Sequence, residues 1–140
     1  MSWYAAHLIM YVKLKALSQS RLPVWENIVL IKAASEEDAF AKAELRGREE
    51  EGDDDGTFTW GDQPAEWIFA GVRKITLCED EKSRPGDGTK ITYLEMEAKS
   101  KEAIEKLVNG EPVSVRVVDN FRVHPSDEEE KLHARPRVNR

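Results

Sequence analysis

The sequence has a single cysteine, Cys78, among its 140 residues. One cysteine can form neither a disulfide within the chain nor a cysteine-based metal cage. The longest apolar runs, such as residues 28–31, are far shorter than the roughly 20 residues that a membrane-spanning helix needs. The first residues also lack the basic stretch that precedes the apolar core of a signal peptide. These absences favour a cytoplasmic protein that has no membrane partner.

Motifs of known catalytic chemistry are missing as well. No serine, cysteine or lysine lies in a nucleophile motif, and His7 is far in sequence from His124 and His133, so no metal-ligand spacing exists. The stretch "RPGDGT" (residues 84–89) has too few glycines and precedes a predicted strand, which excludes a phosphate-binding loop. The sequence therefore predicts no cofactor and favours a protein that is not an enzyme.

Positive charge is scarce. The net charge is −6, and residues 35–66 alone carry twelve acidic and three basic side chains, a net of −9. Non-specific binding of nucleic acid needs clustered lysines and arginines that displace phosphate counterions. We therefore expect no nucleic-acid partner, whereas a basic protein partner is compatible with this charge because opposite potentials speed encounter.

The length predicts one domain over residues 1–120, followed by a polar tail over residues 121–140 that has too few apolar side chains for a core. Ser35 and Ser100 each precede a helical pattern and are predicted to cap two helices. Apolar periodicity predicts strands at residues 3–15, 24–34, 57–60, 65–79, 90–98 and 112–118.

The element order predicts an α+β fold with a mainly antiparallel sheet and two helices packed on one face, in the order ββα-ββα-β. A shift of 64 to 65 residues relates Trp3 to Trp67 and the two capping serines to each other. This suggests an internal duplication of a two-strand-plus-helix unit. Gly71 is predicted to be a bulge that switches the buried face of its strand from even to odd positions.

The stretch "EGDDDGTFTWGD" (residues 51–62) resembles a calcium loop in part. An EF-hand loop places oxygen ligands at positions 1, 3, 5 and 12, with glycine at position 6. The side chains at those ligand positions are Glu51, Asp53, Asp55 and Asp62. The last position is aspartate instead of glutamate and the next segment is predicted to be a strand, so the alternative is a solvated acidic loop.

Aromatic and polar side chains on the long predicted strands form a candidate ligand or partner surface. Its members are Trp3, His7, Tyr11, Trp25, Glu26, Trp67 and Arg73. The aromatic residues around His7 are typical of a ligand groove or of a packing surface. Glu26 and Arg73 interrupt apolar strands and are predicted to form an ion pair, because buried charges are costly unless they are paired. The alternative is the polar floor of a ligand site, with the carboxylate as acid or base.

Five segments together resemble a known family. They are "WYAAHLIMYVKL", "PVWENIVLIKAASEEDAFAKAE", "REEEGDDDG", "WIFAGVRKITLCED" and "RPGDGTKITYLEME". Over about residues 3–118 the chain resembles the bacterial family called domain of unknown function 4288. The resemblance implies a small bacterial protein and supplies no activity, cofactor or catalytic residue.

The sequence favours a non-enzymatic protein-interaction domain that self-associates, most simply as a homodimer, or that binds a protein partner. One layer of helices leaves the second face of the first predicted strand uncovered, and that face carries hydrophobic side chains. The acidic block would fit an accessory or toxin-antagonist-like role. The alternative is a small-ligand-binding protein or an unfamiliar enzyme with a site around His7, Glu26 and Arg73.

Overall fold

The computed structural model describes residues 1–16, 18–78 and 84–118. The main sheet contains four strands in the spatial order β2-β1-β4-β3, and each neighbouring pair is antiparallel. Two further short strands, β5 and β6, pair with each other in a separate sheet. The elements in chain order are β1 (Ser2–Leu14), β2 (Val24–Ala33), α1 (Glu36–Glu49), β3 (Thr59–Trp60), β4 (Gln63–Leu77), β5 (Met96–Glu97), α2 (Lys101–Val108) and β6 (Arg116–Val117).

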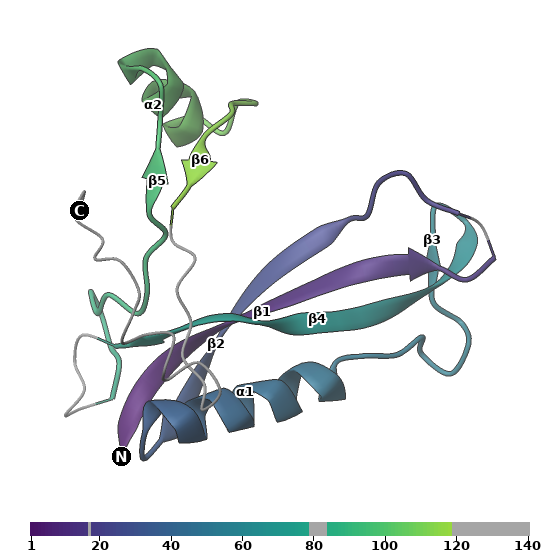
Figure 1. Cartoon of the computed structure of the whole chain (residues 1–140), viewed down its shortest axis with the longest axis horizontal. Helices are drawn as coiled ribbons and strands as arrows, with labels where there is room; N and C mark the ends of the chain where they lie inside the picture. The colour runs from purple at the N-terminus through teal and green to yellow at the C-terminus, as the bar shows by residue number, and fades with distance from the viewer. Residues whose placement is uncertain (17, 79–83, 119–140) are drawn as a thin grey trace, which may run out of the picture.

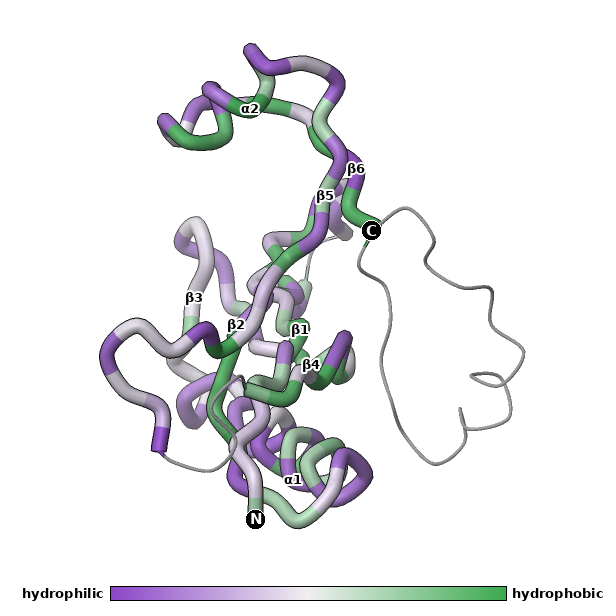
Figure 2. The backbone as a smooth tube through the Cα atoms, turned by 90° about the vertical axis from the view of Figure 1, so that its left-hand side faces the viewer, coloured by the Kyte–Doolittle hydropathy of each residue, from purple (hydrophilic) through white to green (hydrophobic). Residues whose placement is uncertain are grey.

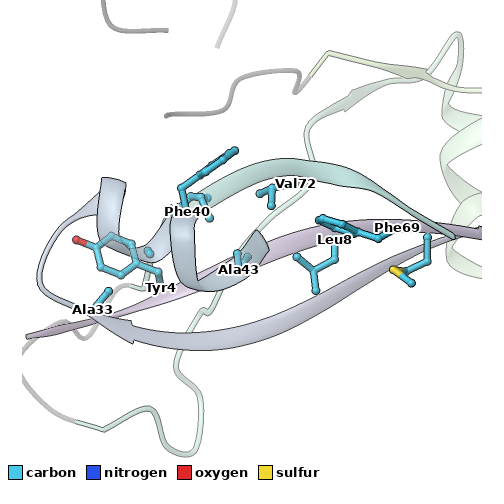
Figure 3. Packing of buried hydrophobic residues seen from close by; sticks show 11 residues of the cluster. Tyr4, Leu8, Ala33, Phe40, Ala43, Phe69 and Val72 are labelled. Carbon is cyan, nitrogen blue, oxygen red and sulfur yellow. The ribbon is translucent and has the colours of Figure 1, made fainter. Parts of the chain in front are cut away.

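The core lies between α1 and one face of the main sheet (Figure 1). Successive side chains of a strand point to opposite faces, so the even positions of β1, such as Leu8 and Met10, face the helix. Ser35 begins the helix as predicted, and its side chain accepts a hydrogen bond from the backbone N–H of Asp38. The buried side chains that meet in this core include Tyr4, Leu8, Ala33, Phe40, Ala43, Phe69 and Val72 (Figure 3).

Gly47 allows the last turn of α1 to approach the sheet closely. A Cβ atom at this position would overlap the aromatic ring of Phe69. Replacing Gly47 with alanine should therefore lower the free energy of unfolding by about 1–2 kcal/mol, because overpacking costs more than the roughly 1 kcal/mol of helix propensity that alanine gains. Chemical denaturation of both proteins measures the change, and a stabilised variant would show that the helix does not pack this closely.

Strand β4 contains the bulge predicted at Gly71, and a second irregularity follows it. Register shifts occur where β4 lies opposite His7/Leu8 and Ile9/Met10 of β1. Before the bulge the core face carries Phe69, an odd position, and after it Val72, an even position. Residue 73 is then the extra residue of the second shift, and Ile75 returns the core face to odd positions. The predicted direction of the switch, from even to odd, is therefore wrong at Gly71, because the part of β4 before the bulge already presents odd positions to the core.

The α+β class, the mainly antiparallel sheet and the presence of two helices are confirmed. The position of the second helix differs from the prediction. Residues 94–118, which contain β5, α2 and β6 and which we call the arm, project away from the main sheet (Figures 1 and 2). No residue of α2 is buried, so this helix does not cover the sheet beside α1.

The strand predicted at residues 90–98 is reduced to β5, and the one predicted at residues 112–118 is reduced to β6. In the described residues, neither α1 nor α2 has the length and apolar character of a helix that spans a membrane. The polar tail predicted at residues 121–140 lies outside the described residues.

Candidate functional site

His7 lies in the middle of β1, on the face of the sheet opposite α1. It stands between Ile28 of β2 and Lys74 of β4 in the strand register, and its side chain has no exposed surface. Its odd position directs it away from the helix. The segment of residues 91–93, which we call the strap, comes from a distant part of the sequence and contacts the sheet beside it.

The imidazole of His7 connects a carboxylate to a hydroxyl group. Its Nδ1 lies 2.7 Å from Oε2 of Glu26, and its Nε2 lies 2.7 Å from Oγ1 of Thr92. An ionised carboxylate only accepts hydrogen bonds, so Nδ1 donates to Glu26, and in a neutral imidazole Nε2 accepts from the Thr92 hydroxyl. Oγ1 of Thr92 lies 3.3 Å from Oγ1 of Thr76. These four side chains form a continuous polar chain across the sheet.

Two cations border this polar chain. Nη1 of Arg73 lies 3.7 Å from Oε2 of Glu26, which confirms the predicted ion pair between these residues. That Nη1 atom is buried and has no hydrogen-bond partner among the described residues. Lys74 is 3% exposed, and its Nζ donates to the carbonyl oxygen of Tyr93 at 2.6 Å and lies 4.0 Å from the centre of the Tyr93 ring. The charge of Lys74 is thus stabilised by a carbonyl dipole and an aromatic face.

The strap is held to the sheet at three consecutive residues. Cys78 contacts the carbonyl oxygen of Ile91 at 3.7 Å, His7 contacts the side chain of Thr92, and Lys74 contacts Tyr93. Sequence reasoning missed Thr92, because no local pattern shows that a residue 85 positions away meets His7. The period-two pattern around Thr92 is the available signal, and it predicts a strand instead.

Trp3 and Tyr11 share the face of His7 on β1, as their spacing predicts. Residues four positions apart in a strand are roughly 13 Å apart, and the structure gives Trp3 a different neighbour, the ammonium group of Lys32 at 5.7 Å from its ring. Tyr11 pairs with Val24 of β2 and Ile68 of β4. The three residues therefore lie in a row along the strand and do not converge on one point.

Trp25 and Trp67 lie on the other face of the sheet, beyond the C-terminal end of α1. Trp25 lies opposite Met10 and Trp67 lies opposite Val12 in the strand register. Met10 and Val12 are even positions of β1, which face the core. Each tryptophan forms close ring contacts: Trp25 with Trp67 at 4.8 Å and with Trp60 at 5.6 Å, and Trp67 with Phe58 at 5.5 Å. We call Trp25, Phe58, Trp60 and Trp67 the aromatic cluster. The residues proposed as one surface are thus divided between two places.

The acidic side chains considered as calcium ligands have other contacts. Oε2 of Glu51 accepts a hydrogen bond from the backbone N–H of Phe69 at 2.9 Å. Asp53 binds the ammonium group of Lys15 and caps the turn at Gly56. The Lys15 contact, followed by the backbone N–H of Gly56, lowers the pKa of Asp53. Within residues 1–16, 18–78 and 84–118 no group of three or more histidine, cysteine or acidic side chains is placed to hold a metal ion. Calcium binding by Glu51, Asp53, Asp55 and Asp62 stays a prediction that a calorimetric titration would test.

A family model described as Domain of unknown function (DUF4288) matches residues 3–91. The chain belongs to this family. No curated protein and no solved structure matches the chain. The DUF4288 match includes His7, Glu26, Lys74 and the aromatic cluster, but it ends at residue 91 and not near residue 118 as the resemblance implied. Thr92 and the arm of this DUF4288 protein lie beyond the matched region.

The thiol of Cys78 provides a test of the strap. Cys78 is 1% exposed, and burial raises the pKa of its thiol. Because the thiolate is the reactive form, Cys78 should react with Ellman's reagent at pH 8 far more slowly in the folded protein than in the chain unfolded by guanidinium. A rate in the folded protein equal to that of the unfolded chain would show that the strap does not cover the thiol.

The same raised pKa has a consequence for stability. The stability that the protonated Cys78 thiol contributes to the folded chain is fully present below the ordinary thiol pKa of about 8.5. As the pH rises above that value the unfolded chain loses a proton that the folded chain retains, so the free energy of unfolding falls. Replacing Cys78 with serine should remove this contribution to the pH dependence, because a serine hydroxyl does not titrate in this range.

Proposed function

We propose that this DUF4288 protein is a non-enzymatic interaction domain that self-associates as a homodimer through its arm. The observation that carries the proposal is α2. Ile104 is 50% exposed and Leu107 is 41% exposed, and no residue of this helix is buried. An eight-residue helix is marginal in water by itself, and most helix stability comes from packing of an apolar face. The helix therefore needs a surface to cover Ile104 and Leu107.

A comparison with α1 indicates what kind of surface is needed. Ser100 caps α2 as Ser35 caps α1, with a hydrogen bond from the backbone N–H three residues later. The shift of 65 residues that relates Ser35 to Ser100 aligns Ile104 with Ala39 and Val108 with Ala43. Ala39 and Ala43 are buried in the core against the sheet. The proposed duplication thus supports a sheet face as the missing partner of α2.

Among the described residues, the same chain offers a sheet face that the strap covers only in part. β2 is an edge strand, and its even positions point away from α1. Val24, Ile28 and Leu30 on that face are 59%, 40% and 41% exposed. If α2 of each copy packs on β2 of the other copy, one two-fold axis generates the contact twice. A second copy of the chain is therefore the partner that fits both surfaces.

The experiment is size-exclusion chromatography with light scattering. The native chain of 16.0 kDa should have the mass of two chains, and the double variant Ile104→Glu/Leu107→Glu should have the mass of one. Loss of two apolar side chains at each of two contacts should weaken dimerisation at least about a hundredfold. The control is Glu105→Gln/Lys106→Gln, which changes neighbouring polar residues of the same helix and should remain a dimer. A native protein that stays a single chain at high concentration would contradict the proposal.

A second candidate function, an enzyme or small-ligand site around His7, Glu26 and Arg73, has one observation in its favour. The order hydroxyl, imidazole, carboxylate in Thr92, His7 and Glu26 is the order of a hydrolase triad. Against it, His7 is completely buried and its two ring nitrogens both have partners. Because no substrate can reach a buried imidazole, these contacts favour a structural role in which His7 holds the strap through Thr92.

Intact mass spectrometry after treatment with a fluorophosphonate probe separates the two candidates. The interaction proposal predicts an unmodified chain. A single adduct on Thr92 that disappears in the His7→Gln variant would establish the triad as a nucleophile and would favour the enzyme.

A further inference from the structure

The aromatic cluster lies at the opposite end of β1 from the N-terminus, near the hairpin between β1 and β2. Trp25 is 36% exposed and Trp60 is 41% exposed, and their rings meet edge to face at 5.6 Å. Trp67 meets the ring of Trp25 edge to face, and Phe58 stacks on Trp67. β3 pairs with β4 through Thr59 and Trp60, and this pairing fixes the backbone of Trp60. Two indoles held in place before binding lose little conformational entropy when a partner covers them.

A hollow beside Trp60 extends the apolar surface. It has a volume of about 430 Å³ and is bordered by four apolar residues, Leu14, Leu22, Pro23 and Trp60, and by the polar residues 18–21. Leu22 is 49% exposed. Tryptophan is enriched among the residues that dominate binding energy, and such residues contact pockets that receive an apolar side chain of the partner. The cluster and the hollow together have the features of an anchor site.

The loop that carries the outer part of the aromatic cluster is acidic, whereas the hollow beside it is bordered by one basic residue, Arg21. Residues 49–62, which contribute Phe58 and Trp60, carry seven acidic and no basic side chains. Lys15 is already paired with Asp53. Asp54, Asp55 and Asp62 are exposed, and all three adopt positive φ angles in the turns of this loop. The partner must therefore bring positive charge to the rim of an apolar contact.

We propose that the aromatic cluster and the acidic loop form a docking surface for a basic protein segment that carries an apolar anchor side chain. The negative charge disfavours nucleic acid and anionic membranes, which carry the same sign. It also disfavours a second copy of this chain, because a two-fold contact would bring the two acidic loops together. The surface is separate from the arm, so it adds a partner to a domain that self-associates elsewhere.

The probe is a short fluorescein-labelled peptide of alternating arginine and leucine. The control peptide has serine in place of every leucine and the same charge. Fluorescence anisotropy of the full chain should show binding of the arginine–leucine peptide, at least about tenfold tighter than binding of the arginine–serine peptide. Added salt should weaken both, because exposed charges are screened.

Two protein variants separate the apolar part of the site from the acidic part. Trp60→Ala should weaken the arginine–leucine peptide at least about tenfold. The triple variant Asp54→Asn/Asp55→Asn/Asp62→Asn should do so as well, and it keeps the backbone unstrained because asparagine tolerates positive φ. The control Glu102→Gln/Glu105→Gln/Glu111→Gln removes three exposed charges from the arm and should leave the affinity unchanged.

Several outcomes would overturn the proposal. Equal binding of the two peptides, or binding that does not respond to Trp60→Ala, would reduce the surface to non-specific charge attraction. No binding of either peptide would also contradict it. If Trp60→Ala changes the native mass from two chains to one, a second copy covers the cluster. Failure of the arm variants to change the mass, by contrast, would contradict self-association through the arm and leave the docking surface intact.

Discussion

Replacing His7 with alanine is expected to lower the free energy of unfolding by about 3 kcal/mol or more. The substitution leaves a cavity under the strap and removes a hydrogen-bond partner from both Glu26 and Thr92. A polar group that loses its partner costs up to about 1–3 kcal/mol where it is buried, and less for Glu26, whose side chain is 29% exposed. The cavity left by the buried imidazole therefore supplies the larger part of the loss. Urea denaturation followed by circular dichroism measures the change.

Thr92→Val is the matched comparison for the His7 variant. It keeps the shape of the side chain and removes only the hydroxyl group that meets Nε2 of His7, so the expected loss is smaller, about 1–2 kcal/mol. Cys78 should also react faster with Ellman's reagent in both variants, because the strap contacts Cys78 and His7 through the adjacent residues Ile91 and Thr92. A His7→Ala protein as stable as the native chain, with Cys78 still protected, would show that His7 does not hold the strap.

Replacing Leu8 with alanine should cost about 3–5 kcal/mol, the range found for fully buried leucines. Leu8 is 1% exposed and lies on the central strand β1 in the core beneath α1, in the same cluster as Phe40 and Val72 (Figure 3). The surrounding strands restrain collapse of the cavity. Thermal and chemical denaturation should both show the loss.

Leu45→Ala is the control for the core. Leu45 is on the same helix that covers Leu8 but is 65% exposed, so its replacement should change stability by less than about 0.5 kcal/mol. Equal effects of the two substitutions would contradict the packing of α1 against β1.

The parts of the fold that the sequence predicts are those with local causes. The period of two in β1 and the capping serines of both helices depend on neighbours in the chain, and the structure confirms them. The bulge at Gly71 is predictable because a glycine inside a strand has no side chain to pack and commonly marks a break in the ladder. The ion pair of Glu26 and Arg73 follows from the cost of unpaired charge in a sheet.

The parts that the sequence does not predict depend on contacts between distant segments. Residues 90–95 have the composition of a strand, but they cross the sheet face and bond through the side chain of Thr92 and the backbone of Tyr93. Sequence periodicity reports which side chains share a face and not which element covers it. For the same reason the apolar stripe of α2 predicts a helix correctly but does not show that it lies away from the main sheet.

In the proposed dimer, the exposed apolar side chains of α2 in one copy cover those of β2 in the other copy. Two variants each remove one of the two surfaces that form the proposed contact. Ile104→Glu/Leu107→Glu disables the arm and keeps β2 intact, and Ile28→Glu/Leu30→Glu disables β2 and keeps the arm intact. Each variant alone should be a single chain, since its dimer would lack one half of both contacts.

Native mass spectrometry of an equimolar mixture of these two variants, one of them labelled with ¹⁵N, is the most direct measurement. A mixed pair retains one intact contact, formed by the arm of one chain and β2 of the other. Mixed dimers should form, and neither variant should form dimers with itself. Dimers of each variant alone, or a mixture that remains single chains while the native protein forms dimers, would contradict it.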